Sequence, residues 1–151
     1  MRMMRTAAIS FLLLGILSVG GIPAGEASDY LGQFCWQATS PGGSAVVKAA
    51  VNHMGDGHFL LNGKFTDTTG VVEAFVASAE VSGSSVYMTS TSAGSDSSGT
   101  WISIGRFLLN LSNLNGSGEL LRIAHSASSP NSQNASLGYE GPVTVTFIPC
   151  P

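Results

Sequence analysis

Hydrophobic and polar residues alternate in short runs from Tyr30 onwards, and Gly, Ser, Asn and Asp separate these runs. A period of two is typical of a strand with one buried face, whereas an amphipathic helix repeats about every 3.6 residues. No stretch after Tyr30 combines good helix formers with a sustained helical period. The pattern therefore predicts an all-β domain.

We expect about eight strands joined mostly by hairpin-length turns. Their expected ranges are 33–38, 47–51, 58–66, 71–81, 86–89, 101–111, 119–125 and 143–148. The run at 71–81 is apolar on both faces, so its inward face stays unassigned, and 107–111 is also compatible with a helical turn. We expect loops at 93–99 and 126–136 and a turn at 113–118.

Aromatic residues mark one face of the first expected strand. Phe34 and Trp36 lie on this face together with Ala38, and Cys35 lies on the other. Because side chains alternate across a strand, we expect the two aromatic rings to point into the core and Cys35 to point outward.

The turn between the second and third strands decides the faces of two histidines. A two-residue turn would place His53 opposite His58 on one face. A three-residue Gly-Asp-Gly loop at 55–57 pairs Val51 with Leu61 and places the histidines on opposite faces. We favour the longer loop because it keeps the apolar residues together, and a one-residue slip would invert every face.

The two cysteines of the chain, Cys35 and Cys150, lie in its first expected strand and just after its last. Short links predict an antiparallel meander, and closure into an up-and-down barrel removes its two unpaired edges. Closure brings both cysteines within the roughly 7 Å between Cα atoms that a disulfide requires. The alternative is a β-sandwich of the immunoglobulin type, in which the bridge joins two interior strands.

The N-terminus has the pattern of a secretory signal peptide: a basic start, an apolar segment and small residues near Ala27. We expect residues 1–27 to be a signal peptide, with cleavage at Ala24 as the alternative, and residues 28–151 to form one domain. The apolar segment is shorter than the roughly 20 residues of a membrane span. We therefore expect an exported protein, periplasmic or extracellular, with no membrane insertion after cleavage.

Charged residues make up only 10% of the chain, against about 25% in an ordinary soluble protein. The basic side chains after residue 27 are Lys48, Lys64, Arg106 and Arg122, and they form no cluster along the chain. Because phosphate binding needs clustered positive charge, nucleic acid is excluded as a partner. The sequence identifies no protein partner.

The segment Gly32-Gln33-Phe34-Cys35-Trp36 resembles the first strand of the calycin group, the small secreted β-barrels of the lipocalin and avidin type. Lipocalins carry Gly-x-Trp there, whereas this chain has Gly-x-x-x-Trp. The resemblance covers the strand count, the first strand and the chain-closing disulfide. It implies that Trp36 plugs one end of the barrel and that the other end is open to a small apolar ligand.

Candidate catalytic and metal-binding residues form no recognisable motif. The chain has no Gly-x-Ser-x-Gly elbow, and its histidines lack partners at ligand spacing. We interpret the glutamates Glu73, Glu80, Glu119 and Glu140 as solvated strand residues rather than a catalytic pair. The sequence therefore predicts no enzyme, no metal site and no cofactor.

A ligand site inside the barrel is the leading functional hypothesis. An eight-stranded barrel is either filled by side chains or holds one small molecule. We expect Phe59, Phe65 and Trp101 to contact a small apolar or aromatic ligand, because small residues such as Ala49 leave space beside them. The alternative is a filled core in a structural or interaction module of the cell envelope.

Overall fold

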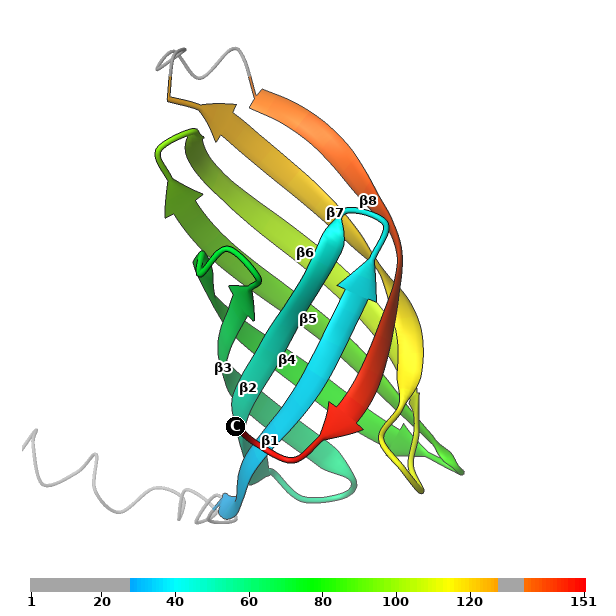
Figure 1. Ribbon diagram of the computed structural model, residues 1–151. Helices are drawn as coiled ribbons and strands as arrows, with labels where there is room; N and C mark the ends of the chain where they lie inside the picture. The colour runs from blue at the N-terminus through cyan, green and yellow to red at the C-terminus, as the bar shows by residue number, and fades with distance from the viewer. Residues whose placement is uncertain (1–27, 128–134) are drawn as a thin grey trace, which may run out of the picture.

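Eight strands make up the fold of the computed structural model, which describes residues 28–127 and 135–151 (Figure 1). They are β1 (Asp29–Ser40), β2 (Gly43–His53), β3 (His58–Asp67), β4 (Val72–Ser82), β5 (Ser85–Asp96), β6 (Gly99–Asn110), β7 (Gly116–Ser126) and β8 (Ala135–Ile148). Within these two ranges no helix is long and apolar enough to cross a membrane. The expected signal peptide and most of the expected loop at 126–136 lie outside the described residues.

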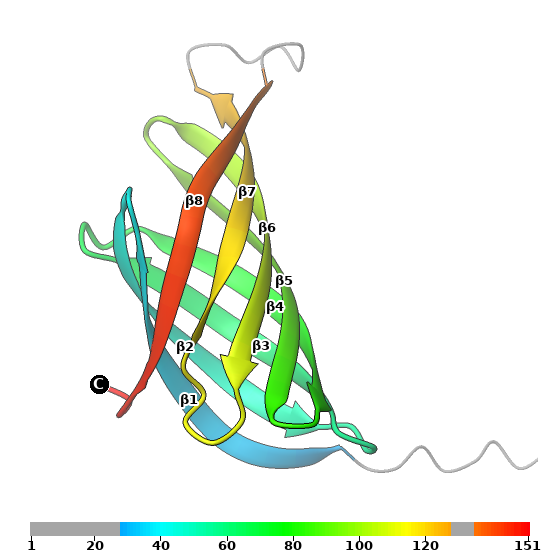
Figure 2. The same cartoon turned by 90° about the vertical axis from the view of Figure 1, so that its right-hand side faces the viewer.

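The strands form a closed antiparallel barrel in sequence order, with β8 pairing back onto β1 (Figures 1 and 2). This confirms the predicted up-and-down barrel and excludes the β-sandwich, because one continuous ladder runs around the whole sheet. Alternate turns lie at the same end of such a barrel. The β1–β2, β3–β4 and β5–β6 turns, the end of β7 and the start of β8 therefore surround one mouth, and both chain ends of the barrel domain lie at the opposite end.

Several strands are longer than the sequence pattern predicts. Residues 93–96, expected in a loop, pair with β6. The strand expected at 101–111 is present, and its residues 107–110 continue β6 rather than starting a helical turn. Residues 116–118, expected in a turn, begin β7, and β8 begins at Ala135. The wrong boundaries share a cause: Ser and Gly are common in turns, but in a narrow barrel they also provide room for large inward side chains.

The turn between β2 and β3 has the predicted three-residue form. The Met54 N–H donates to the His58 carbonyl oxygen at 2.8 Å, and Asp56 adopts a positive φ of 48°. Val51 pairs with Leu61, which confirms the predicted register. His53 consequently lies on the inner face and His58 on the outer face, so the two imidazoles cannot share a ligand.

Buried and exposed side chains alternate along β4, and this assigns the inward face of residues 71–81 that the sequence analysis left open. Its odd-numbered residues Phe75, Ala77 and Ala79 are buried, whereas Val72 and Val76 are exposed on the outer surface.

The inner faces of the strands build one apolar core in the half of the barrel opposite the mouth. Its buried members are Trp36, Ala38, Val47, Ala49, Val51, Leu61, Phe75, Ala77, Ala79, Val86, Phe107, Leu109, Val143 and Val145.

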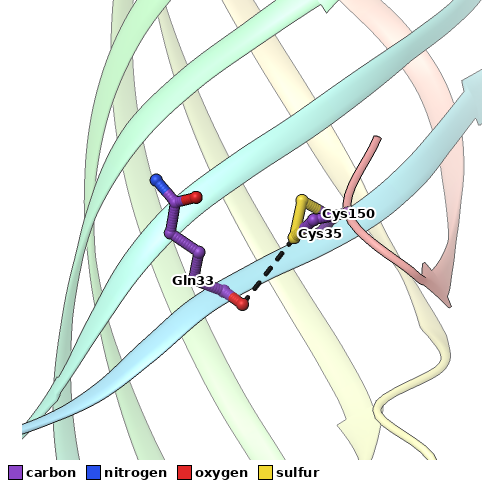
Figure 3. Close-up of a disulfide and its surroundings, with 3 residues drawn as sticks. All are labelled: Gln33, Cys35 and Cys150. Carbon is purple, nitrogen blue, oxygen red and sulfur yellow. Dashed lines mark hydrogen bonds between the residues drawn. A yellow bond between two sulfur atoms is a disulfide. The ribbon is translucent and has the colours of Figure 1, made fainter.

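A disulfide joins Cys35 of β1 to Cys150, which follows β8 (Figure 3). The two Cα atoms are 5.1 Å apart, and the bond spans 115 positions of the chain. Cys35 points outward, as predicted, yet it is fully buried because the C-terminal segment covers it. Figure 3 also marks a 3.7 Å approach of the Cys150 Sγ to the Gln33 carbonyl oxygen, a contact without a hydrogen because a disulfide sulfur carries none.

Disulfides form and persist in oxidising compartments and are rare in reducing ones. The Cys35–Cys150 bond therefore indicates that the protein folds in an oxidising, exported environment. Neither cysteine is free to act as a nucleophile or a metal ligand.

Removing the disulfide should destabilise the barrel strongly. The double variant Cys35→Ala, Cys150→Ala loses the cross-link of a loop longer than 100 residues, for which we expect a loss of about 2–5 kcal/mol in the free energy of unfolding. Urea denaturation of the oxidised wild type and the variant measures this loss. An unchanged denaturation midpoint would show that β1–β8 pairing alone closes the barrel.

Candidate functional site

The mouth of the barrel opens into a cavity of about 740 Å³. This volume lies within the range of roughly 300–1,000 Å³ that is typical of small-molecule sites. The apolar half beneath is nearly filled, with a residual space of about 30 Å³ beside Trp36 and Phe107. A bound molecule therefore fits in the half of the barrel nearer the mouth.

An ion-pair cluster lies in the wall of this cavity. The Arg122 guanidinium on β7 donates from Nη2 to Oε1 of Glu73 at 2.8 Å, and its Nε lies 3.0 Å from Oε1 of Glu140. The side chains are 30% (Arg122), 15% (Glu73) and 33% (Glu140) exposed. One cation thus binds two carboxylates in a site that is only partly open to water.

Neighbouring polar and aromatic side chains hold the cluster in place. The Ser92 hydroxyl donates to Oε2 of Glu73 at 2.8 Å, and Arg122 Nε donates to the Ser103 hydroxyl at 3.3 Å. The guanidinium carbon also lies 5.1 Å from the ring centroid of Trp101, within the range of a cation–π contact. Both carboxylate oxygens of Glu73 are therefore occupied.

The ladder register explains why these residues meet. Ser92, Ser103 and Arg122 are consecutive cross-strand partners on β5, β6 and β7, all on the inner face. A bulge in the β7–β8 ladder then shifts the faces of β8, and Gly141 there takes a φ of 73°. The bulge places Glu140 beside Arg122, although Val143 and Val145 also point inward.

Trp101 is buried against the backbone of β5. A Cβ atom added at Gly94 would lie 2.6 Å from the Trp101 ring, so only glycine gives the indole this space. The indole Nε1 is buried and has no acceptor within residues 28–127 and 135–151. Buried donors in folded proteins are nearly always paired, with protein, water or ligand.

Aromatic packing fills the end of the barrel opposite the mouth. The Trp36 indole donates to the Leu114 carbonyl oxygen in the β6–β7 turn at 3.1 Å. Its ring packs edge-on against Phe147 with centroids 5.8 Å apart, and Phe34 packs against both. Trp36 is thus fixed at this end by one hydrogen bond and two ring contacts.

Two aspartates organise turns at the mouth. Asp67 accepts hydrogen bonds from Thr69 and from the Val71 N–H, and Asp96 accepts them from Ser98 and the Gly99 N–H. The hydroxyl of Thr69 is the main cause that lowers the pKa of Asp67, and that of Ser98 lowers the pKa of Asp96. Both carboxylates are therefore ionised at neutral pH.

The structure places two of the three predicted ligand-contacting aromatics at the cavity. Phe65 and Trp101 line it, and Trp101 does so as part of the ion cluster. Phe59 does not line it and instead packs against His53 at a centroid distance of 5.1 Å, on the apolar side of the barrel. Their role in binding stays a prediction.

The interpretation of all four glutamates as solvated strand residues is wrong for two of them. Glu80 and Glu119 are exposed on the outer face, as expected. Glu73 and Glu140 point inward and bind Arg122, a residue that the sequence analysis did not place inside the barrel. The missed signal is the alternation in β7, where Leu121 points outward and Arg122 inward.

The described part of the chain contains no group of three or more His, Cys, Asp and Glu side chains that could hold a metal ion. Comparison of the chain with protein-family models, curated proteins and solved structures finds no match.

Replacing Arg122 should destabilise the fold because it leaves two partly buried carboxylates facing each other without a cation. We expect Arg122→Gln to lower the free energy of unfolding by about 1–3 kcal/mol. The matched control is Arg106→Gln, since Arg106 is exposed on the outer face of β6 and should change stability by less than about 0.5 kcal/mol. Urea denaturation of both variants checks this, and equal losses would contradict a structural role for the cluster.

We expect acid to destabilise the turns that Asp67 and Asp96 hold at the mouth. Because folding lowers the pKa values of Asp67 and Asp96, their contribution to stability is complete above the ordinary aspartate pKa of about 4 and is lost as the pH falls through the lowered values. The variant Asp67→Asn, Asp96→Asn keeps the acceptor oxygens but cannot titrate there. Melting temperatures measured from about pH 7 to about pH 2.5 should fall less in the variant than in the wild type, and parallel curves would refute the assignment.

Proposed function

We propose that this protein is an exported, non-enzymatic binding protein that holds one small molecule in the open half of its barrel. The observation that carries the proposal is the cavity of about 740 Å³ at the mouth, which has the Arg122 cluster in its wall. The opposite end is filled by aromatic side chains. A one-ended pocket of this kind suits binding and release through the mouth.

The lining of the cavity supports a ligand with two kinds of surface. Phe65, Trp101 and Leu120 offer apolar contact area, whereas Glu73, Arg122 and Glu140 offer charge. Sites for small molecules commonly combine apolar walls with a few placed polar groups that orient the ligand. We therefore propose a ligand that has an apolar or aromatic part and also carries a polar group.

We also propose a cellular location for the protein and a structural similarity to the calycins. The disulfide supports export, and we propose that the protein acts in the periplasm or outside the cell. The eight-stranded closed barrel supports the proposed similarity to calycins, and the position of Trp36 at the filled end is consistent with the plug that the similarity implies. Fold likeness alone does not assign a ligand.

A second candidate is a structural or interaction module of the cell envelope. It is favoured by apolar rows on the outer face, where Ile102, Ile123 and Leu137 are successive cross-strand partners on β6, β7 and β8. All three are about half exposed or more. Surfaces of this kind commonly mark contact sites.

Native mass spectrometry of the protein purified from its own host tests the binding function. We expect an additional small-molecule mass on the wild type that Ala45→Phe removes, because Ala45 lines the cavity and a phenyl ring there blocks it. The control is Ala50→Phe, which lies on the outer face of the same strand and should keep the bound mass. A ligand-free wild type that fractionates with the envelope would instead favour the interaction module.

A further inference from the structure

We propose that the cavity is specific for small organic cations, such as primary ammonium or amidinium compounds with an aromatic or apolar body. The proposal deepens the proposed binding function and rests on it. It is based on a net negative charge inside the barrel, on the carboxylate of Glu140 at the cavity and on the buried indole N–H of Trp101, which has no acceptor among the described residues.

The charge imbalance is the first observation. Arg122 lies between Glu73 and Glu140, so the cluster holds one positive charge against two negative ones. The other basic side chains among the described residues point outward from their strands: Lys48, Lys64 and Arg106. The interior near the mouth is therefore negative by one elementary charge.

The rim adds charge of the same sign. The carboxylates of Asp67 and Asp96 line the same cavity and are ionised at neutral pH. A cleft with charges of one sign and low-dielectric walls focuses the field and concentrates ions of the opposite sign. The mouth should thus attract cations and repel anions before any contact forms.

Glu140 is the side chain with capacity left for a ligand. Glu73 uses both oxygens, one for Arg122 and one for the Ser92 hydroxyl. Glu140 uses Oε1 for Arg122, and its side chain is one-third exposed at the cavity, so its second oxygen Oε2 is the atom placed to accept from a bound molecule. A carboxylate oxygen in this position accepts a charge-assisted hydrogen bond from an ammonium or amidinium group.

The buried indole of Trp101 is an independent sign of an incomplete site. Its residue is 9% exposed, it lines the same cavity, and its Nε1–H lacks an acceptor within the described chain. A buried hydrogen-bond donor without an acceptor lowers the stability of the fold, and a bound molecule that supplies an acceptor removes this penalty. A hydrogen-bond acceptor carried by the body of the bound molecule, beside its cationic group, would satisfy this donor.

Isothermal titration calorimetry with three probes of nearly equal size tests the proposal: 2-phenylethylammonium, 2-phenylethanol and phenylacetate. We expect the ammonium compound to bind at least about tenfold more tightly than the alcohol, and the carboxylate to bind most weakly. Its affinity should also fall as salt rises, because salt screens partly exposed charges.

Two matched variants locate the site. Glu140→Gln removes the uncompensated charge while Glu73 still pairs Arg122, so we expect its affinity for 2-phenylethylammonium to fall about tenfold. Glu80→Gln, on the outer face of β4, should bind like the wild type. Melting curves confirm that each variant is folded, and the probe comparison on the wild type needs no variant.

The outcomes separate this inference from the function on which it rests. Equal or tighter binding of the alcohol or the carboxylate, or an unaltered affinity in Glu140→Gln, would overturn cation specificity and leave the binding function standing. If none of the three probes binds, cation specificity is overturned as well. If native mass spectrometry also finds no bound molecule, the binding function fails with it.

Discussion

Closure of β8 onto β1 is the constraint on which the rest of the structure depends. The β1–β8 ladder extends only from Cys35–Ile148 to Thr39–Thr144 and is the shortest of the eight described ladders. An open meander would expose two strand edges and the inner apolar face. The disulfide ties the last residues of the chain to this seam, and a cross-link over so long a loop restricts the unfolded chain strongly.

Closure also divides the interior into two chemically different halves. Away from the mouth, Trp36, Phe34 and Phe147 pack with the aliphatic core, so that half holds no molecule of useful size. Toward the mouth the same strands present serine, glycine and charged residues, and the space stays open. A charged cluster persists there because Arg122 contacts both carboxylates and because water reaches the mouth, which reduces the cost of desolvation.

Much of the fold could be predicted from the sequence, since alternation, turn residues and the two cysteines all agree on a closed barrel. The β2–β3 register followed from keeping Val51 and Leu61 on one face. The inner face of 71–81 could not be predicted, because valines outside and alanines inside give no contrast in polarity. The Arg122 cluster could not be predicted for two reasons. A charged residue in a strand usually points to solvent. Glu140 points inward only because of a bulge in the β7–β8 ladder, and no sequence pattern marks that bulge.

The barrel is filled by aromatic side chains at one end, and we propose that it holds a small molecule beside Glu140 and Arg122 at the other. A high-resolution crystal structure of the protein purified from its own host tests this most directly. We expect non-protein density in the cavity, with a hydrogen-bond donor of the bound molecule at Oε2 of Glu140. A cavity filled by repacked side chains, with the Arg122 cluster inaccessible from the mouth, would contradict it.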